Sequence, residues 1–420
     1  MTWLDLLWLV ALGLLHWLNR ARFARLPLHM DTGFYVTNAA IAERRYRPFR
    51  GWNPYFSGNS RLLPEWLHST LYLRVGAERY PAAFRALYTW LTLVAALGYG
   101  ALAWALLGTP RAFWPSAFCS AALLSEAQYG AYFESAETFE VAAQALGIAC
   151  LAWGIALGMP GLGALGLGFL WLDALLLKSS AALACGLITL VLLGSDTLRW
   201  PALACAVLAA VGLYSLLRAA TPSLTEKLLH MRRHERYVRR NYASPLRLMA
   251  VKLGFSGKLL ARAPLLPALA GAGALALSLP LVAAEDGVLR VYTALGVGAL
   301  AALLWQGNRV WYYMLPLVGL CGPLFTAALL ALERSSGELL AALVGSSALC
   351  ASYVLNLWQV RGSDQLLHSR RVFAVYDQGA RGAAHGTRFA EANHELMLAC
   401  RQFRARVQGQ SLLVVGGHNQ

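Results

Sequence analysis

Charged residues are scarce in this chain of 420 residues. Asp, Glu, Lys and Arg make up only 14% of it, whereas about a quarter of the residues in a typical soluble domain are charged. Hydrophobic residues make up 58%. This composition excludes an ordinary soluble protein and predicts an all-α, polytopic membrane protein.

Acidic residues are scarcer than basic ones, at 21 against 36, which gives a formal net charge of +15. In a soluble protein this excess would suggest nucleic acid as a partner. Here the basic residues lie in segments beside membrane helices, where anionic lipid head groups or lipid-linked phosphates are the nearer partners. We therefore expect membrane lipid and no nucleic acid among its partners. Cysteines with CxxC or Cys/His spacing are also lacking, so the sequence supports neither a disulfide framework nor a zinc site.

Apolar runs between charged residues predict about eleven transmembrane helices, because a spanning helix needs ~20 apolar residues. The predicted helices lie near 3–19, 82–108, 112–125, 138–158, 161–177, 180–194, 200–218, 263–284, 288–305, 310–331 and 338–358. The pair at 161–177 and 180–194 is short and is separated by Lys178-Ser179-Ser180. It is either two half-depth helices or one long kinked element.

Eleven crossings place the longer connecting segments (20–81, 126–137, 219–262 and 359–420) on one face. Most of the 36 Lys and Arg residues lie in these segments. Counting positive charges would put this face in the cytoplasm, but the rule weakens for long loops and for residues that serve a phosphate ligand. The charge count therefore leaves the orientation open. We predict a transmembrane domain at 1–358 and a small soluble α/β appendix at 359–420.

Four local patterns lie at the ends of these helices. They are an acid soon after the first helix in His29-Met30-Asp31-Thr32-Gly33, the acidic stretch Phe133-Glu134-Ser135-Ala136-Glu137, the segment GLGFLWLDALLLKSSAALACGLITLVLL with Lys178, and Asn308-Arg309-Val310-Trp311-Tyr312-Tyr313-Met314-Leu315-Pro316. Together they resemble motifs of the GT-C superfamily of polyprenyl-phosphate-dependent glycosyltransferases, which includes protein O-mannosyltransferases and aminoarabinose transferases. The resemblance covers roughly residues 1–330.

The resemblance implies a GT-C-like helical bundle with a large first extracytoplasmic loop in a bacterial inner membrane. Its function would be inverting transfer of a sugar from a polyprenyl-phosphate donor to an acceptor outside the cytoplasm. Asp31 would be the catalytic base, since a carboxylate near the membrane surface can take a proton from the acceptor. The other reading of Asp31 is a cap on a helix that begins at Thr32.

The remaining candidate residues fall into two groups. A second carboxylate would orient the acceptor or bind a divalent cation, and the candidates are Glu126, Glu134 and Glu137. Their alternative is a solvated helix start. The donor phosphate would be bound by Lys178, Arg309, Arg44, Arg45 and Arg61. Their alternative is attraction to lipid head groups, with Lys178 extending to the membrane interface.

Two further residues and one rival function stay open. Asp173 is an acid inside a predicted helix, and Lys178 at i+5 is not an ideal pairing partner. His68 is a minor candidate because it lies at the end of the polar stretch 29–73. The rival function is a transporter or a scaffold subunit of a larger membrane assembly without catalysis. Thr32 follows Asp31 where relatives carry an Asp-Glu dyad, so the donor sugar and the acceptor are not specified.

Overall fold

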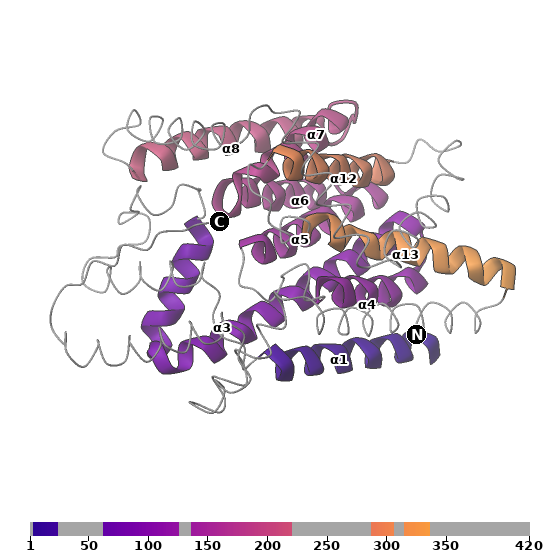
Figure 1. The fold of residues 1–420 in the computed structure, drawn as a ribbon. Coiled ribbons are helices and arrows are strands. Elements are labelled where there is room, and N and C mark those ends of the chain that lie inside the picture. The colour runs from indigo at the N-terminus through magenta and orange to yellow at the C-terminus, as the bar shows by residue number, and fades with distance from the viewer. Residues whose placement is uncertain (1–2, 24–61, 126–135, 221–286, 306–314, 337–420) are drawn as a thin grey trace, which may run out of the picture. The chain divides into compact units, whose positions relative to one another are not determined.

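The computed structural model describes residues 3–23, 62–125, 136–220, 287–305 and 315–336 (Figure 1). Within these ranges every element is helical and no strand occurs. The predicted helices 263–284 and 338–358 and the appendix at 359–420 lie outside the described residues.

Helices occupy each of the predicted ranges that the structure describes. They are α1 (Trp3–Phe23), α3 (Leu62–Leu107), α4 (Phe113–Leu124), α5 (Ala136–Ala156), α6 (Pro160–Leu172), α7 (Ala182–Leu192), α8 (Arg199–Ala220), α12 (Gly287–Trp305) and α13 (Leu315–Ser336), with short 3-10 turns η1 (Pro110–Ala112) and η4 (Ser179–Ala181) and a π-helical turn η3 (Asp173–Leu177).

Four of the described helices are long and apolar enough to cross a membrane. These candidate spans are Ala82–Leu107, Glu137–Ala156, Pro160–Leu177 and Leu315–Glu333. The apolar parts of α1, α7, α8 and α12 are shorter. Large apolar side chains also face outward, for example Leu208 on α8, which is 69% exposed. Contiguous exposed apolar surface is unusual in a soluble protein and fits contact with lipid. The predicted count of eleven spans stays a prediction.

The end of the predicted loop 20–81 is helical, because α3 begins at Leu62. Leu63, Leu67 and Leu71 recur every four residues and therefore share one face of a helix. They pack against a buried cluster of Tyr80, Phe84, Tyr88, Phe139 and Leu177. α3 bends at Gly76, which has φ 78° and ψ 165° (Figure 1). Glycine adopts a positive φ without the steric cost that other residues pay.

α5 is the central helix of the described bundle. It packs against α3, α6, α12 and α13. Of its candidate span, 67% is buried, compared with 39% of the span in α6 and η3. The residues of its first turns, 137–142, are all buried, so their polar side chains lie in the interior.

Glycines let α5 and α6 approach closely. Gly154 faces Gly163, and Gly166 faces the backbone of Gly147 and Leu151. A Cβ atom at Gly166 would lie only 2.5 Å from the carbonyl oxygen of Gly147 and the nitrogen of Leu151. Small residues at helix interfaces are how membrane helices gain packing contacts when lipid is as apolar as the protein.

The chain reverses between α6 and α7, so the predicted pair is two helices and not one long kinked element. Lys178 has an extended backbone, with φ −154° and ψ 113°, and separates η3 from η4. Beyond it, the thiol of Cys185 on α7 lies 3.1 Å from the carbonyl oxygen of Leu170 on α6. The side chain of Lys178 is therefore placed at a turn.

Gly166→Ala is expected to destabilise the protein, because the added methyl group would meet the backbone of α5. Forced overpacking typically costs about 1–3 kcal/mol. Gly168→Ala is the matched control in the same helix, since a Cβ atom there meets nothing within 4 Å. Alanine is about 1 kcal/mol more favourable than glycine inside a helix, so the control should raise stability slightly. Thermal unfolding of both purified variants in detergent measures the difference, and equal unfolding temperatures would contradict this account of the packing.

Candidate functional site

The first turns of α5 carry three buried polar side chains on one face. Glu137, Glu140 and Gln144 are spaced i, i+3 and i+7, which places them on one side of a helix. They are 0%, 2% and 3% exposed. This face is directed into the bundle because α5 is its central helix.

Lys178 lies against two of these side chains. Its Nζ atom is 2.5 Å from Oε1 of Glu137 and 3.5 Å from Oε2 of Glu140. The residue is 8% exposed. The π-helical turn positions it, because the amide of Lys178 donates to the carbonyl of Asp173, five residues earlier. π-helical turns are rare and occur frequently at functional sites.

Asp173 enters the same group through Gln144. The Nε2 atom of Gln144 donates to Oε1 of Glu140 at 3.1 Å and to Oδ2 of Asp173 at 3.0 Å. Asp173 is fully buried. We call Glu137, Glu140, Gln144, Asp173 and Lys178 the acid–lysine cluster.

The charge of the cluster is not balanced by its own members. It combines the carboxyl groups of Glu137, Glu140 and Asp173 with the single ammonium group of Lys178. Removing ions from water costs several kcal/mol per ion, and a good ion pair recovers that cost only in part. The cluster is therefore maintained by the close approach of Lys178 to Glu137 and by the shared amide of Gln144.

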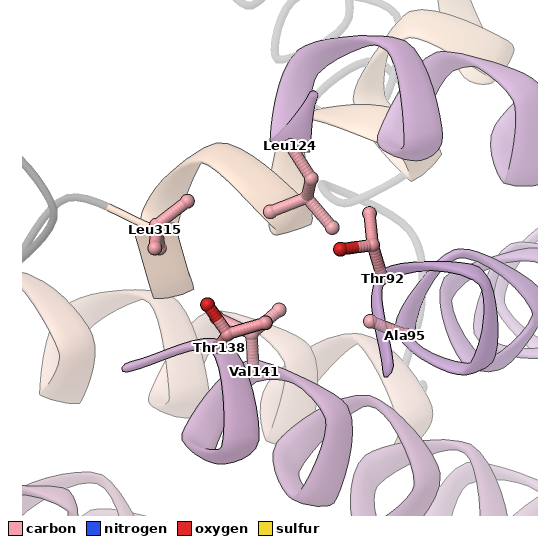
Figure 2. Close-up of a pocket in the computed structure, with 6 residues that line it drawn as sticks. All are labelled: Thr92, Ala95, Leu124, Thr138, Val141 and Leu315. Carbon is pink, nitrogen blue, oxygen red and sulfur yellow. The ribbon is translucent and has the colours of Figure 1, made fainter. Parts of the chain in front are cut away.

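A small cavity lies between four helices, and two of its lining residues, Thr138 and Val141, directly follow Glu137 and Glu140 in α5 (Figure 2). Its volume is ≈ 10 Å³, about the smallest that holds a water molecule. In Figure 2 the hydroxyl groups of Thr92 and Thr138 point into this space. The other lining residues are Ala95, Leu124, Val141 and Leu315. The C-terminal end of α4 and the N-terminal ends of α5 and α13 therefore meet here.

His68 contacts an aromatic cluster, the rings of Tyr80, Phe84, Tyr88 and Phe139, which belong to the buried cluster that packs against the start of α3. Its Nδ1 atom is 2.7 Å from the hydroxyl of Tyr80, and its ring contacts that of Phe84 in a tilted arrangement, with 4.1 Å between centroids. His68 precedes the candidate span of α3, and burial lowers its pKa well below the usual value of 6.5. The ring is therefore neutral in the folded protein at neutral pH and acts in packing.

The structure brings together two of the predicted site residues, Glu137 and Lys178. The other predicted site residues lie outside the described residues, and their roles stay predictions. They are Asp31, Glu126, Glu134, Arg309, Arg44, Arg45 and Arg61.

Three partners in the cluster were not predicted from the sequence. Glu140 and Gln144 were missed, although their spacing from Glu137 is a helical signal. Asp173 had no predicted partner, and the structure gives it Gln144, which is 29 residues away in the chain.

These features define a class: a helical membrane protein with a buried acid–lysine cluster at the turn between two helices. Within the ranges that the structure describes, no group of three or more His, Cys, Asp or Glu residues is arranged to hold a metal ion. No family model, curated protein or solved structure matches this chain.

Lys178→Met is expected to lower stability strongly. The change leaves two buried carboxyl groups without their cation, and breaking a buried ion pair typically costs about 3–5 kcal/mol. Arg111→Met is the matched control, since it breaks an ion pair with Glu333 in which the arginine side chain is 50% exposed. Such a pair contributes about 0–1 kcal/mol. Unfolding in detergent measures both losses. Similar losses in the two variants would show that burial gives Lys178 no special importance.

Lowering the pH below about 6.5 is expected to destabilise the protein through His68. The unfolded chain then binds a proton that the folded chain excludes, because the pKa of His68 is lower in the folded state. The full stability is present above the unfolded pKa, and it falls by up to about 1.4 kcal/mol for each pH unit below it. The free energy of unfolding, measured against pH for the wild type and His68→Gln, checks this. An equal slope in both proteins would exclude His68 as the cause.

Proposed function

We propose that this protein is a membrane glycosyltransferase of the GT-C type. It moves a sugar from a polyprenyl-phosphate donor to an acceptor at the extracytoplasmic face of a bacterial inner membrane, with inversion at the anomeric carbon. The proposal rests on the sequence resemblance and on one structural observation, the contact between Glu137 and Lys178.

That contact supports the proposal because it joins two of the sequence patterns that resemble the GT-C superfamily. Glu137 belongs to the acidic second pattern, and Lys178 is the lysine of the third pattern. Their side chains are 2.5 Å apart although 41 residues separate them in the chain. Motifs that serve one active site must lie together in the fold, whereas unrelated matches in apolar helices have no reason to meet.

The small cavity is lined by residues at or close to the second and fourth sequence patterns. Leu124 and Thr138 flank the segment 126–135, which contains Glu126 and Glu134. Leu315 follows the segment 306–314, which contains Arg309. The described residues that border the second and fourth patterns therefore line one cavity, next to the acid–lysine cluster.

The proposed chemistry needs a base and a site for the leaving phosphate. Asp31 takes the proton of the acceptor hydroxyl, whose oxygen attacks the anomeric carbon while the bond to the phosphate oxygen breaks. The leaving phosphate keeps the bonding electron pair and is stabilised by Arg44, Arg45, Arg61 and Arg309, which can form forked hydrogen bonds. Lys178 contacts the carboxylates of Glu137 and Glu140, so it contributes to phosphate binding only when a phosphate oxygen replaces one of them.

One observation favours the second candidate function, a transporter. Ionisable side chains inside membrane segments commonly mark ion or substrate pathways. The acid–lysine cluster lies at the turn between η3 and α7, beside a candidate membrane span, and is therefore a group of this kind. The test below separates this function from sugar transfer.

Loss of sugar transfer in Asp31→Asn is the expected outcome of the decisive assay. Purified full-length protein in detergent receives radiolabelled polyprenyl-phosphate sugars, with a membrane extract as the source of acceptor. Asparagine keeps the shape of aspartate but cannot accept the proton, and general base catalysis contributes about 10²–10⁴-fold. The matched control is Asp196→Asn, because the side chain of Asp196 is 97% exposed and lies in the turn before α8.

The other outcomes of this assay are equally informative. Transfer that survives in Asp31→Asn would keep the enzyme class and exclude Asp31 as the base. A folded wild-type protein that transfers none of the sugars would favour the transporter.

A further inference from the structure

The acid–lysine cluster is short of hydrogen-bond donors. The amide nitrogen of Gln144 already donates to both Glu140 and Asp173. Within the described part of the chain, Oε1 of Gln144 and Oδ1 of Asp173 accept no hydrogen bond, although both atoms are buried. Nearly all buried polar atoms in proteins have a partner, so two such acceptors on hydrogen-bonded residues call for a donor.

A third buried group points to the same need. Tyr99 on α3 is fully buried, and its hydroxyl makes no hydrogen bond to any described residue. It lies within electrostatic reach of Glu140 and Asp173. A hydroxyl can both donate and accept, so Tyr99 is a neutral polar group within electrostatic reach of these two carboxyl groups.

The charges lead to the same conclusion as the missing donors. Glu140 and Asp173 are two buried carboxyl groups bridged by one neutral amide, and Lys178 lies 3.5 Å from Glu140 and closer to Glu137. Two ionised carboxylates that share a buried site repel each other, and one of them takes up a proton. Protonation removes one negative charge and turns one carboxyl oxygen into a donor.

The titratable groups around this pair come from several elements. α5 contributes Glu137 and Glu140, and Lys178 is the cation. α3 contributes Tyr99, and α7 contributes the thiol of Cys185, which is within electrostatic reach of Asp173 and Glu140. Cys321 on α13 is within electrostatic reach of Tyr99.

We propose that Asp173 and Glu140 together bind one exchangeable proton, so that the acid–lysine cluster is a buried protonation site inside the membrane bundle. The proton comes from hydronium in water and forms an O–H bond with one carboxylate oxygen, and no electron is transferred. Gain and loss of this proton change the net charge that Lys178 faces at the turn between η3 and α7. This site requires neither sugar transfer nor transport, so its failure and theirs are separable.

Infrared difference spectroscopy tests this site on the full-length protein in detergent. A protonated carboxylic acid has a C=O stretching band that a carboxylate lacks, and the band shifts in D₂O when the proton is exchangeable. We expect such a band in the wild type at neutral pH. Above the midpoint of its titration, it should weaken about tenfold for each further pH unit.

Three variants locate the band. Asp173→Asn and Glu140→Gln should each abolish it, because the remaining carboxyl group is then paired with a neutral amide. Asp196→Asn, an exposed control, should leave it unchanged. Circular dichroism confirms folding, and a failure of one variant to fold leaves the other as the test.

Three outcomes would overturn the proposal. One is a wild-type protein without the band at neutral pH. Another is a band that persists in both folded variants. The third is loss of the band on adding sodium ions at constant pH, which would identify a cation site instead.

Discussion

The burial of Lys178 between Glu137 and Glu140 is the interaction on which the polar interior of this protein depends. A lysine in an apolar environment is costly unless a carboxylate lies within contact distance, and here the closest approach is 2.5 Å. The contact joins the first turn of α5 to the turn between η3 and α7. It therefore helps to fix the relative position of these two helix ends through charge.

Close packing of α5 and α6 makes this arrangement possible. Gln144 reaches Asp173 because the two helix backbones approach at Gly147, Gly154, Gly163 and Gly166. Larger residues there would separate the helices and break the bridge between Asp173 and Glu140. The aromatic cluster around His68 then covers the neighbouring region with Phe139 of α5 and Leu177 of η3. Packing and electrostatics thus act on the same two elements.

The same geometry has consequences for both proposed functions. In a glycosyltransferase, the ion pair would hold the second and third motifs next to the cavity lined by Leu124, Thr138 and Leu315. In a transporter, the buried titratable pair would form part of an ion pathway. Lys178 is already engaged by two carboxylates, so phosphate binding by this residue requires competition with them.

The sequence by itself determined that the described chain is helical and where most of its described helices lie, because long apolar runs bounded by charges dictate where a chain becomes a membrane helix. It also marked Glu137 and Lys178 as functional candidates. The helical start of α3 was readable from Leu63, Leu67 and Leu71, and the face of Glu137, Glu140 and Gln144 from their spacing, yet both were missed. Only the tertiary structure decided that Asp173 pairs with Gln144 and that Lys178 turns to α5. These contacts span 29 and 41 residues, and local periodicity carries no information on which helix faces meet.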